Sequence, residues 1–279
     1  MLKTQDYAAV TQIRMSREID GKPVYWVAAY LVDDLLIDTG CSHTSQELSD
    51  FLEGKGVRQV VNTHYHEDHM GGNHDLMRRY GVRVYAHPDS IPLIAQGFDL
   101  YPYQEIAWGY PAPTEAIPVP DILQTPRHTF QVLETPGHCR GHICLMEAAR
   151  GWCFTGDLFA RAQPKFVRPE ENIGQIMDSM RAVMAAAGPS LVLFTAVGKI
   201  VEDGQRALKD CLDYLSGLAA RSKDLQKAGY DLDAIVRDLF GGEHPFAQLT
   251  NGQFSTFNLV RSLLESAAEK ARPHLDNGR

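Results

Sequence analysis

Several features of membrane and secreted proteins are absent from this sequence. The longest apolar run covers residues 24–32 and is too short to cross a bilayer, which takes about 20 residues in a helix. The opening stretch MLKTQDYAAVTQIR contains no apolar signal-peptide segment. The five cysteines are odd in number and form no C-x-x-C pair, which favours a reduced, cytoplasmic protein without disulfides. No contact with a membrane is therefore expected.

An excess of positive charge is also absent, as are two common catalytic motifs. Asp and Glu together number 35 against 27 for Lys and Arg, so the net charge is −8. This balance disfavours binding to nucleic acid or to an anionic membrane. The chain has no G-x-S-x-G motif for a serine nucleophile and no glycine-rich phosphate loop for ATP. The expected partner is a small-molecule substrate, and a homo-oligomer is left open.

What is present is an ordinary globular composition of 279 residues, with 44% hydrophobic and 22% charged residues, which is enough for a large core. Apolar runs and helical periodicity predict the regular elements. The expected strands cover residues 24–32, 35–37, 57–63, 82–86, 130–133, 142–146, 152–155 and 191–195. The expected helices cover residues 45–52, 73–80, 173–187, 205–226, 231–240 and 255–270. No strand is expected after residue 202.

Two segments carry more specific expectations. The run Thr44-Ser45-Gln46-Glu47 matches a capping box, in which the Thr44 side chain caps the helix that follows. Residues 97–120 contain five prolines interspersed with aromatic residues, which predicts a long loop without a regular element. Such a loop either lines a substrate pocket or crosses the surface with its aromatic residues packed on the core.

A cluster of metal-ligating residue types follows the expected strand at 57–63. His64, His66, Asp68 and His69 form an H-x-H-x-D-H run, which holds three of the chain's 11 histidines. In an extended segment His64 and His66 face the same side, and Asp68 and His69 follow where a turn folds them back. Imidazole nitrogen and carboxylate oxygen are suitable zinc ligands. A solvated polar loop is the alternative, but the density and position of the run favour a metal site.

Four motifs, in this order, resemble those of the metallo-β-lactamase superfamily. They are Asp38-Thr39-Gly40, the H-x-H-x-D-H run, the P-G-H-x-x-G-H run from Pro136 to His142, and Thr155-Gly156-Asp157. The third looks especially like the motif of glyoxalase II-like members. The resemblance covers roughly residues 25–200, and the later part of the chain carries no recognisable signature.

The resemblance implies a four-layer αββα sandwich over residues 1–201, with a metal site at one edge of its two sheets, and a helical extension over residues 202–279. It implies that His64, His66 and His138 hold a first metal ion. Asp68 and His69 would hold a second ion, and Asp157 would bridge both. Asp38 and His142 would orient these ligands without binding the metal. The implied cofactor is zinc, as one or two ions, and the nitrogen and oxygen donors also suit iron or manganese.

One element of the family's pattern is missing. The family usually supplies a last histidine after a later strand, and Val197 stands at the corresponding place in this chain. Valine cannot bind a metal, so the second site is weak, absent or completed from elsewhere. His244 is a candidate replacement, although burial statistics favour a plain surface histidine at that position.

The function expected from these features is metal-dependent hydrolysis of a small carbonyl substrate, such as a thioester, ester or lactone, by a metal-bound hydroxide. Asp68 would position the water or the second ion and transfer a proton. One alternative is a mononuclear iron oxidoreductase of the same fold, similar to persulfide dioxygenases. Another is a non-catalytic metal-binding relative. The helical extension would cover part of the pocket, with the aromatic segment 97–120 as its opposite wall.

Overall fold

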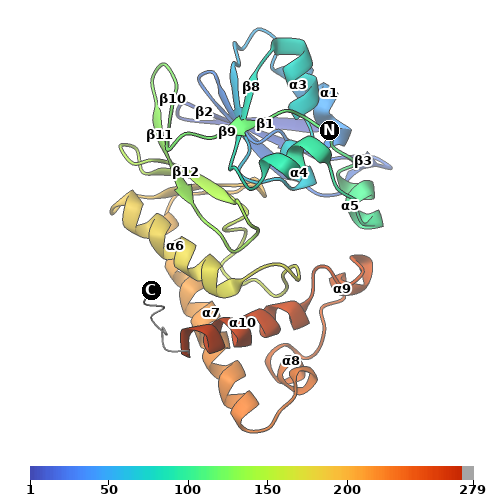
Figure 1. The fold of residues 1–279 in the computed structure, drawn as a ribbon, viewed down its shortest axis with the longest axis vertical. Coiled ribbons are helices and arrows are strands. Elements are labelled where there is room, and N and C mark those ends of the chain that lie inside the picture. The colour runs from blue at the N-terminus through green and yellow to red at the C-terminus, as the bar shows by residue number, and fades with distance from the viewer. Residues whose placement is uncertain (272–279) are drawn as a thin grey trace, which may run out of the picture.

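The computed structural model describes residues 1–271 and leaves residues 272–279 undescribed. Two β-sheets stack face to face with helices on both outer sides, which is the predicted αββα sandwich (Figure 1). The first sheet contains, in spatial order, β1 (Leu2–Tyr7), β2 (Val10–Met15), β5 (Val27–Val32), β6 (Leu35–Ile37), β7 (Gln59–Val61), β8 (Arg83–Ala86) and β9 (Ile117–Pro118). The second contains β10 (Ile122–Gln124), β11 (Thr129–Glu134), β12 (Ile143–Glu147), β13 (Trp152–Gly156), β14 (Val192–Thr195) and β15 (Ile200–Val201). A separate hairpin joins β3 (Glu18–Ile19) to β4 (Lys22–Pro23).

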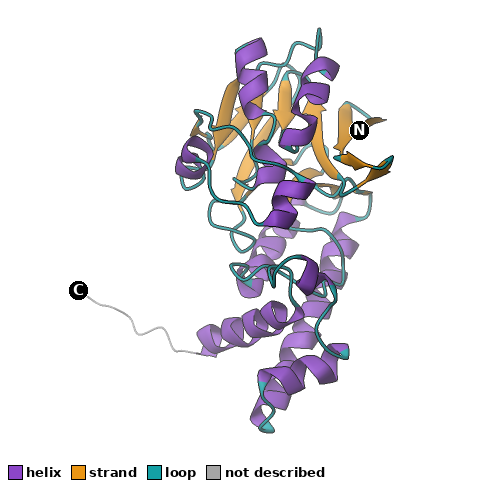
Figure 2. Cartoon of the chain, turned by 90° about the vertical axis from the view of Figure 1, so that its right-hand side faces the viewer, coloured by secondary structure: helices purple, strands orange, loops and turns teal. Residues whose placement is uncertain are grey.

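The helices fall into two groups along the chain. The first group is η1 (Ser42–Thr44), α1 (Ser45–Phe51), α2 (Glu67–Met70), α3 (Asn73–Tyr80), α4 (Ile91–Gln96) and α5 (Pro102–Ala107). The second group is α6 (Ile173–Ala187), α7 (Gly204–Lys227), α8 (Leu232–Phe240), α9 (Phe246–Leu249) and α10 (Thr256–Ala271). Figure 2 shows the helices of the second group extending beyond the sandwich on one side. Among residues 1–271, no helix is both long enough and apolar enough to cross a bilayer.

The sandwich is held together by cores on both faces of its central strands. Alternate residues of a strand point to opposite faces. In β5, Val27 and Ala29 pack towards α1 and α3, while Ala28 and Tyr30 face the second sheet. Because both faces are covered, the strand appears in the sequence as an unbroken apolar run.

The second sheet shares its outer core with the C-terminal helices. Cys144 and Met146 of β12 belong to one buried cluster with residues of α6, α7 and α10. The predicted helical extension is confirmed, and it packs on α6 and, through α7, directly on β14. The division of the chain at residue 201 stays a prediction.

All of the expected strands and helices are present, with ends shifted by a few residues, but several local expectations were wrong. The capping box does not form, because the Thr44 hydroxyl donates to the carbonyl oxygen of Cys41 (3.1 Å) instead of capping α1. Segment 97–120 contains α5, since Pro102 occupies the first helical position, where its missing N–H costs nothing. It also contributes the edge strand β9.

The N-terminal strands β1 and β2 and the strand β10 were not expected from the sequence. β1 is a sheet-edge strand whose residues are mostly exposed. Its composition therefore carries little of the apolar alternation on which strand prediction depends.

Strand directions bring the loops that carry the motifs to one edge of the sandwich. β6 and β7 run parallel in the first sheet, as do β13 and β14 in the second. The two sheets are joined at this edge by backbone hydrogen bonds from Ile143 N to Thr63 O (2.8 Å) and from Ala28 N to Ala196 O (2.7 Å). The loops after these strands therefore meet in space.

The start of α6 is anchored to α10 by the side chains of Ser262 and Ser266, and Ser262 gives a test of the packing. The Ser262 hydroxyl accepts from Ile173 N (2.9 Å) and donates to Glu171 O (2.8 Å). We expect Ser262→Ala to lower the free energy of unfolding by about 1–3 kcal/mol, because both backbone groups lose their partner. Denaturant unfolding measures the difference. Ser216→Ala, at an exposed position of α7, is the control, and equal losses in the two variants would contradict this anchoring role.

Candidate metal centre

Four of the predicted ligands converge on one point. One ligand atom from each of His64, His66, His138 and Asp157 can be chosen so that all four lie within 4.8 Å of one another. His66 Nδ1 lies 2.9 Å from His64 Nε2 and 3.0 Å from His138 Nε2. His138 Nε2 lies 3.4 Å from Asp157 Oδ2. Metal–ligand distances of about 2.0–2.2 Å place tetrahedral ligand atoms roughly 3.3–3.6 Å apart, so this group needs only small adjustments to surround an ion.

A second group lies next to the first and shares Asp157 with it. His69 Nε2 is 3.6 Å from Asp157 Oδ1 and 3.8 Å from Asp68 Oδ2. His69 Nε2 and Asp68 Oδ1 are buried and have no hydrogen-bond partner in the described part of the chain. Buried polar atoms without partners are costly. A cation held between these atoms would satisfy both, so the donor set fits a metal ion.

The short helix α2, which carries Asp68 and His69, is held in place by neighbouring loops. The carbonyl oxygen of His69 accepts hydrogen bonds from Thr39 N (2.8 Å) and Asn62 Nδ2 (3.0 Å). A Cβ atom on Gly71 would lie 2.3 Å from Ser42 N. Only glycine permits this close approach of two backbones, which explains the glycine directly after α2.

Asp38 and His142 form hydrogen bonds to candidate ligands from outside the cluster. Asp38 accepts from His69 Nδ1 (2.8 Å) and also from the backbone N–H of Thr63 (2.7 Å), so the Nε2 atom of His69 is turned towards the cluster. His142 Nε2 accepts from Asp157 N (3.1 Å), and its Nδ1 donates to Thr135 O (3.1 Å). Neither side chain belongs to the four-residue group of ligand atoms.

Two supporting residues were missed in the sequence. Glu171 Oε2 lies 3.4 Å from His138 Nδ1, the nitrogen that faces away from the cluster. Arg168 is buried and pairs with the fully buried Glu67 (3.6 Å). The run from Arg168 to Asn172 precedes a helix, where acidic residues are common because they complement the helix dipole. Nothing in that pattern distinguishes a residue that supports a metal ligand.

Burial and the neighbouring positive charges favour neutral His64 and His66. Burial, assisted by the neighbouring histidines, holds the pKa of His64 well below its usual range. Burial together with Arg168 does the same for the pKa of His66. Neutral imidazole is the form that binds metal.

The pKa of His69 is shifted in the opposite direction to those of His64 and His66. Burial alone would lower its pKa, but Asp38, Asp68 and Asp157 outweigh burial and raise the pKa well above the usual range. Three carboxylates around one imidazole require a positive charge nearby, which either a proton or a metal ion supplies.

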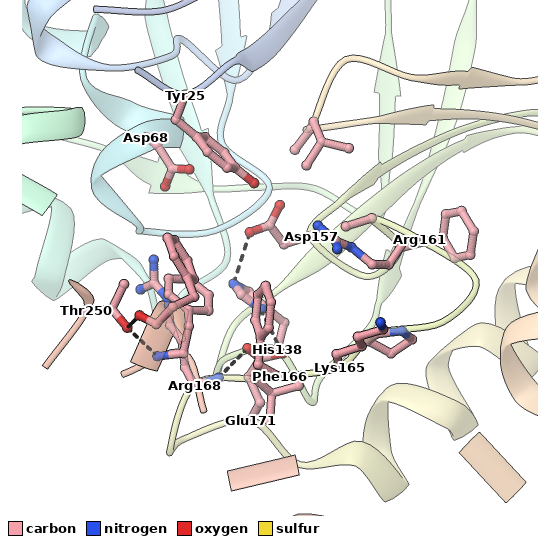
Figure 3. Close-up of a pocket in the computed structure, with 18 of the residues that line it drawn as sticks. Tyr25, Asp68, His138, Asp157, Arg161, Lys165, Phe166, Arg168, Glu171 and Thr250 are labelled. Carbon is pink, nitrogen blue, oxygen red and sulfur yellow. Dashed lines mark hydrogen bonds and ion pairs between the residues drawn. The ribbon is translucent and has the colours of Figure 1, made fainter. Parts of the chain in front are cut away.

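A cavity of about 700 Å³ opens beside the cluster, and Asp68, His138 and Asp157 form part of its wall (Figure 3). Tyr103 and Trp108, from the segment 97–120, line one side of it, and Phe246 and Phe254 of the C-terminal region line another. The aromatic segment therefore lines a pocket, and the C-terminal region covers part of it, as predicted.

Val197 and His244 also line this cavity. The ring of His244 packs on Phe166, with 4.7 Å between the ring centroids. His244 does not belong to the group of converging ligand atoms, and it is half-buried rather than fully exposed. The structure thus offers no support for His244 as the replacement ligand.

Glu171 provides a test of how His138 is held. We expect Glu171→Gln to weaken metal binding by about 10–100-fold, because the His138 ring loses the carboxylate that orients it and increases its basicity. Competition with a chelator measures the affinity. Glu170→Gln is the matched control, since Glu170 is exposed. A loss of affinity in both variants alike would mean that general charge, and not the contact with His138, is responsible.

Comparisons with known proteins identify the family of this chain. The sequence model of the metallo-β-lactamase superfamily matches residues 27–215. A hydroxyacylglutathione hydrolase of Pelagibacter ubique is 28% identical over 170 residues, which cover 56% of this chain and 61% of that protein. A hydroxyacylglutathione hydrolase of Haemophilus influenzae is 25% identical over 156 residues, which cover 53% of this chain and 72% of that protein.

Similarity of fold extends over nearly the whole chain. The crystal structure of a β-lactamase domain protein from Burkholderia ambifaria has a TM-score of 0.67 at 19% sequence identity, covering 96% of this chain and 86% of that one. Because the family model matches more than half of the chain and the fold agrees, this protein belongs to the metallo-β-lactamase superfamily.

Proposed function

We propose that this protein is a metal-dependent hydrolase of a small carbonyl substrate, with a thioester or ester favoured. The observation that carries the proposal is the convergence of His64, His66, His138 and Asp157 beside a cavity large enough for a small molecule, with His138 and Asp157 in its wall. The relatives named hydroxyacylglutathione hydrolase favour hydrolysis over oxidoreduction and over a purely binding role.

The proposed metal sites follow the two groups of side chains. His64, His66, His138 and Asp157 would hold one divalent ion, and Asp68 and His69 would hold a second that shares Asp157. Zinc, iron and manganese all suit nitrogen and oxygen donors. Such an ion, when bound, lowers the pKa of water from near 16 to about 7 and polarises a carbonyl oxygen.

Two side chains would assist the reaction directly. Burial raises the pKa of Asp68 to about 6 in the metal-free protein, and Asp68 would position the attacking water or the second ion and transfer a proton. Partial desolvation in the cavity wall, followed by the charges of Asp157 and Asp68, raises the pKa of Tyr25 to about 12, although the residue is 40% exposed. Tyr25 points into the cavity (Figure 3), where its neutral hydroxyl could donate to the substrate.

Metal reconstitution combined with a thioester assay tests the proposal. We expect purified protein to bind about one to two ions of zinc, iron or manganese per chain and to release thiol from short-chain acyl thioesters only when loaded. His66→Ala should lose both metal and turnover, whereas His74→Ala, outside the cluster, should keep both. Bound metal without turnover on thioesters, esters or lactones would refute the hydrolase, and oxygen consumption with a persulfide would support the iron oxidoreductase instead.

Val197 provides a test of the second site. Val197 lines the cavity just after β14, and we expect Val197→His to supply a further ligand and tighten the second ion at least tenfold. Elemental analysis and metal titration measure the number and affinity of the ions. Val201→His, on β15 and outside the cavity wall, is the control. An unchanged second affinity would show that residue 197 does not occupy the ligand position.

A further inference from the structure

The cavity has an apolar inner wall that the proposed chemistry does not require. Ile173, Ile176 and Met180 of α6 line it, together with Cys211 and Leu215 of α7. All five side chains are buried, and none carries a strong hydrogen-bonding group. A polar ligand would lose its bonds to water there without replacement, at a considerable cost. This part of the cavity therefore suits a hydrocarbon group.

The apolar wall begins directly beside the candidate metal centre. Asn172 N donates to Gly137 O (2.7 Å), and the Ser179 hydroxyl donates to Pro136 O (2.8 Å). A Cβ atom on Gly137 would lie 2.4 Å from Ile176 N, so the first turns of α6 touch the loop that carries His138. A hydrocarbon chain attached to a carbonyl carbon at the candidate metal centre would therefore contact the apolar side chains of α6.

The outer part of the cavity is positively charged. Arg161 and Lys165 lie in its wall on the loop between Asp157 and α6 (Figure 3), and both residues are exposed. Neither forms an ion pair with any side chain of residues 1–266, whereas the buried Arg168 pairs with Glu67. Two unpaired cations at a pocket attract an anionic group, even on a chain of net charge −8.

We propose that the substrates are acyl thioesters or esters with an extended apolar acyl chain and an anionic leaving group. The acyl chain lies between α6 and α7, against Ile176, Met180 and Leu215, and the leaving group lies at Arg161 and Lys165. Hydrolysis adds water across the acyl–sulfur or acyl–oxygen bond and yields a carboxylic acid and the free thiol or alcohol. This assignment rests on the proposed hydrolase function and specifies its substrate class.

A series of acyl-coenzyme A thioesters from acetyl to dodecanoyl tests the proposal on the metal-loaded protein. Each methylene buried in the cavity should raise kcat/KM by about fourfold until the cavity is full. Calorimetry with decanoate and acetate gives a readout that is independent of turnover. We expect decanoate to bind and acetate not to bind. A kcat/KM that is flat or falls with chain length, without decanoate binding, would overturn the acyl site and leave the hydrolase standing. Decanoate binding without turnover of any thioester would instead refute the hydrolase and support the apolar site.

Variants of Met180 test where the end of the acyl chain lies in the cavity. Met180→Phe should shift the acyl-chain length with the highest kcat/KM to a shorter chain, because the larger side chain shortens the space between the helices. Met180→Ala should shift it to a longer chain, because the smaller side chain lengthens that space. Met184→Phe, one turn further along α6 and outside the cavity wall, should leave the optimum unchanged. The same optimum in folded variants at Met180 would contradict the assignment. Should these variants fail to fold, the series on the unmodified protein decides the question.

The leaving-group site has a separate test. The double variant Arg161→Gln and Lys165→Gln should raise KM at least threefold for octanoyl-coenzyme A but not for the uncharged octanoyl-N-acetylcysteamine. Lys227→Gln, at the far end of α7, should raise neither KM. Equal effects on both substrates would show that these cations do not receive the leaving group.

Discussion

The carboxylate of Asp157 is the contact on which the arrangement of the site depends. One of its oxygens lies 3.4 Å from His138 and the other 3.6 Å from His69, so it contacts one histidine that follows a strand of each sheet. Burial would raise the pKa of Asp157, but His69 and His138 outweigh burial and lower it. The negative charge therefore persists although the Asp157 side chain is only 25% exposed, and it attracts the surrounding imidazoles. His142 holds the backbone N–H of the same residue, so its position is set from both sides.

The C-terminal helices are part of the site because they build the wall opposite the metal centre. Val167 pairs with Ser255 through backbone hydrogen bonds in both directions, and Asn258 Nδ2 donates to Val167 O (3.2 Å). These contacts hold the loop that carries Arg161, Lys165 and Arg168. The sandwich alone would leave the metal centre open on this side. The helices thus determine the shape and polarity of the space in which a substrate would lie, while the strand ends determine the position of the ligands.

Much of the sandwich was predictable because its strands are buried on both faces and appear as continuous apolar runs. The exceptions have local causes. β1 lies at a sheet edge and is mostly exposed, and α5 begins with a proline that usually indicates a loop. Thr44 had the right sequence context for a helix cap, but its hydroxyl bonds to Cys41 instead. Pairing with β2 forms β1 although its sequence shows little strand pattern, and the hydrogen bond to Cys41 replaces the helix cap expected at Thr44.

The convergence of the candidate ligands could be expected from the sequence alone, because His64, His66, Asp68 and His69 lie in one short run and His138 and Asp157 stand in motifs that resemble those of a known family. The roles of Glu171 and Arg168 could not, since each depends on a side chain from another segment, His138 in one case and Glu67 in the other. The apolar lining of the cavity arises in the same way, from helices that are distant in sequence. Residue types and spacing specify local chemistry, whereas the surroundings of that chemistry follow from which segments pack against one another.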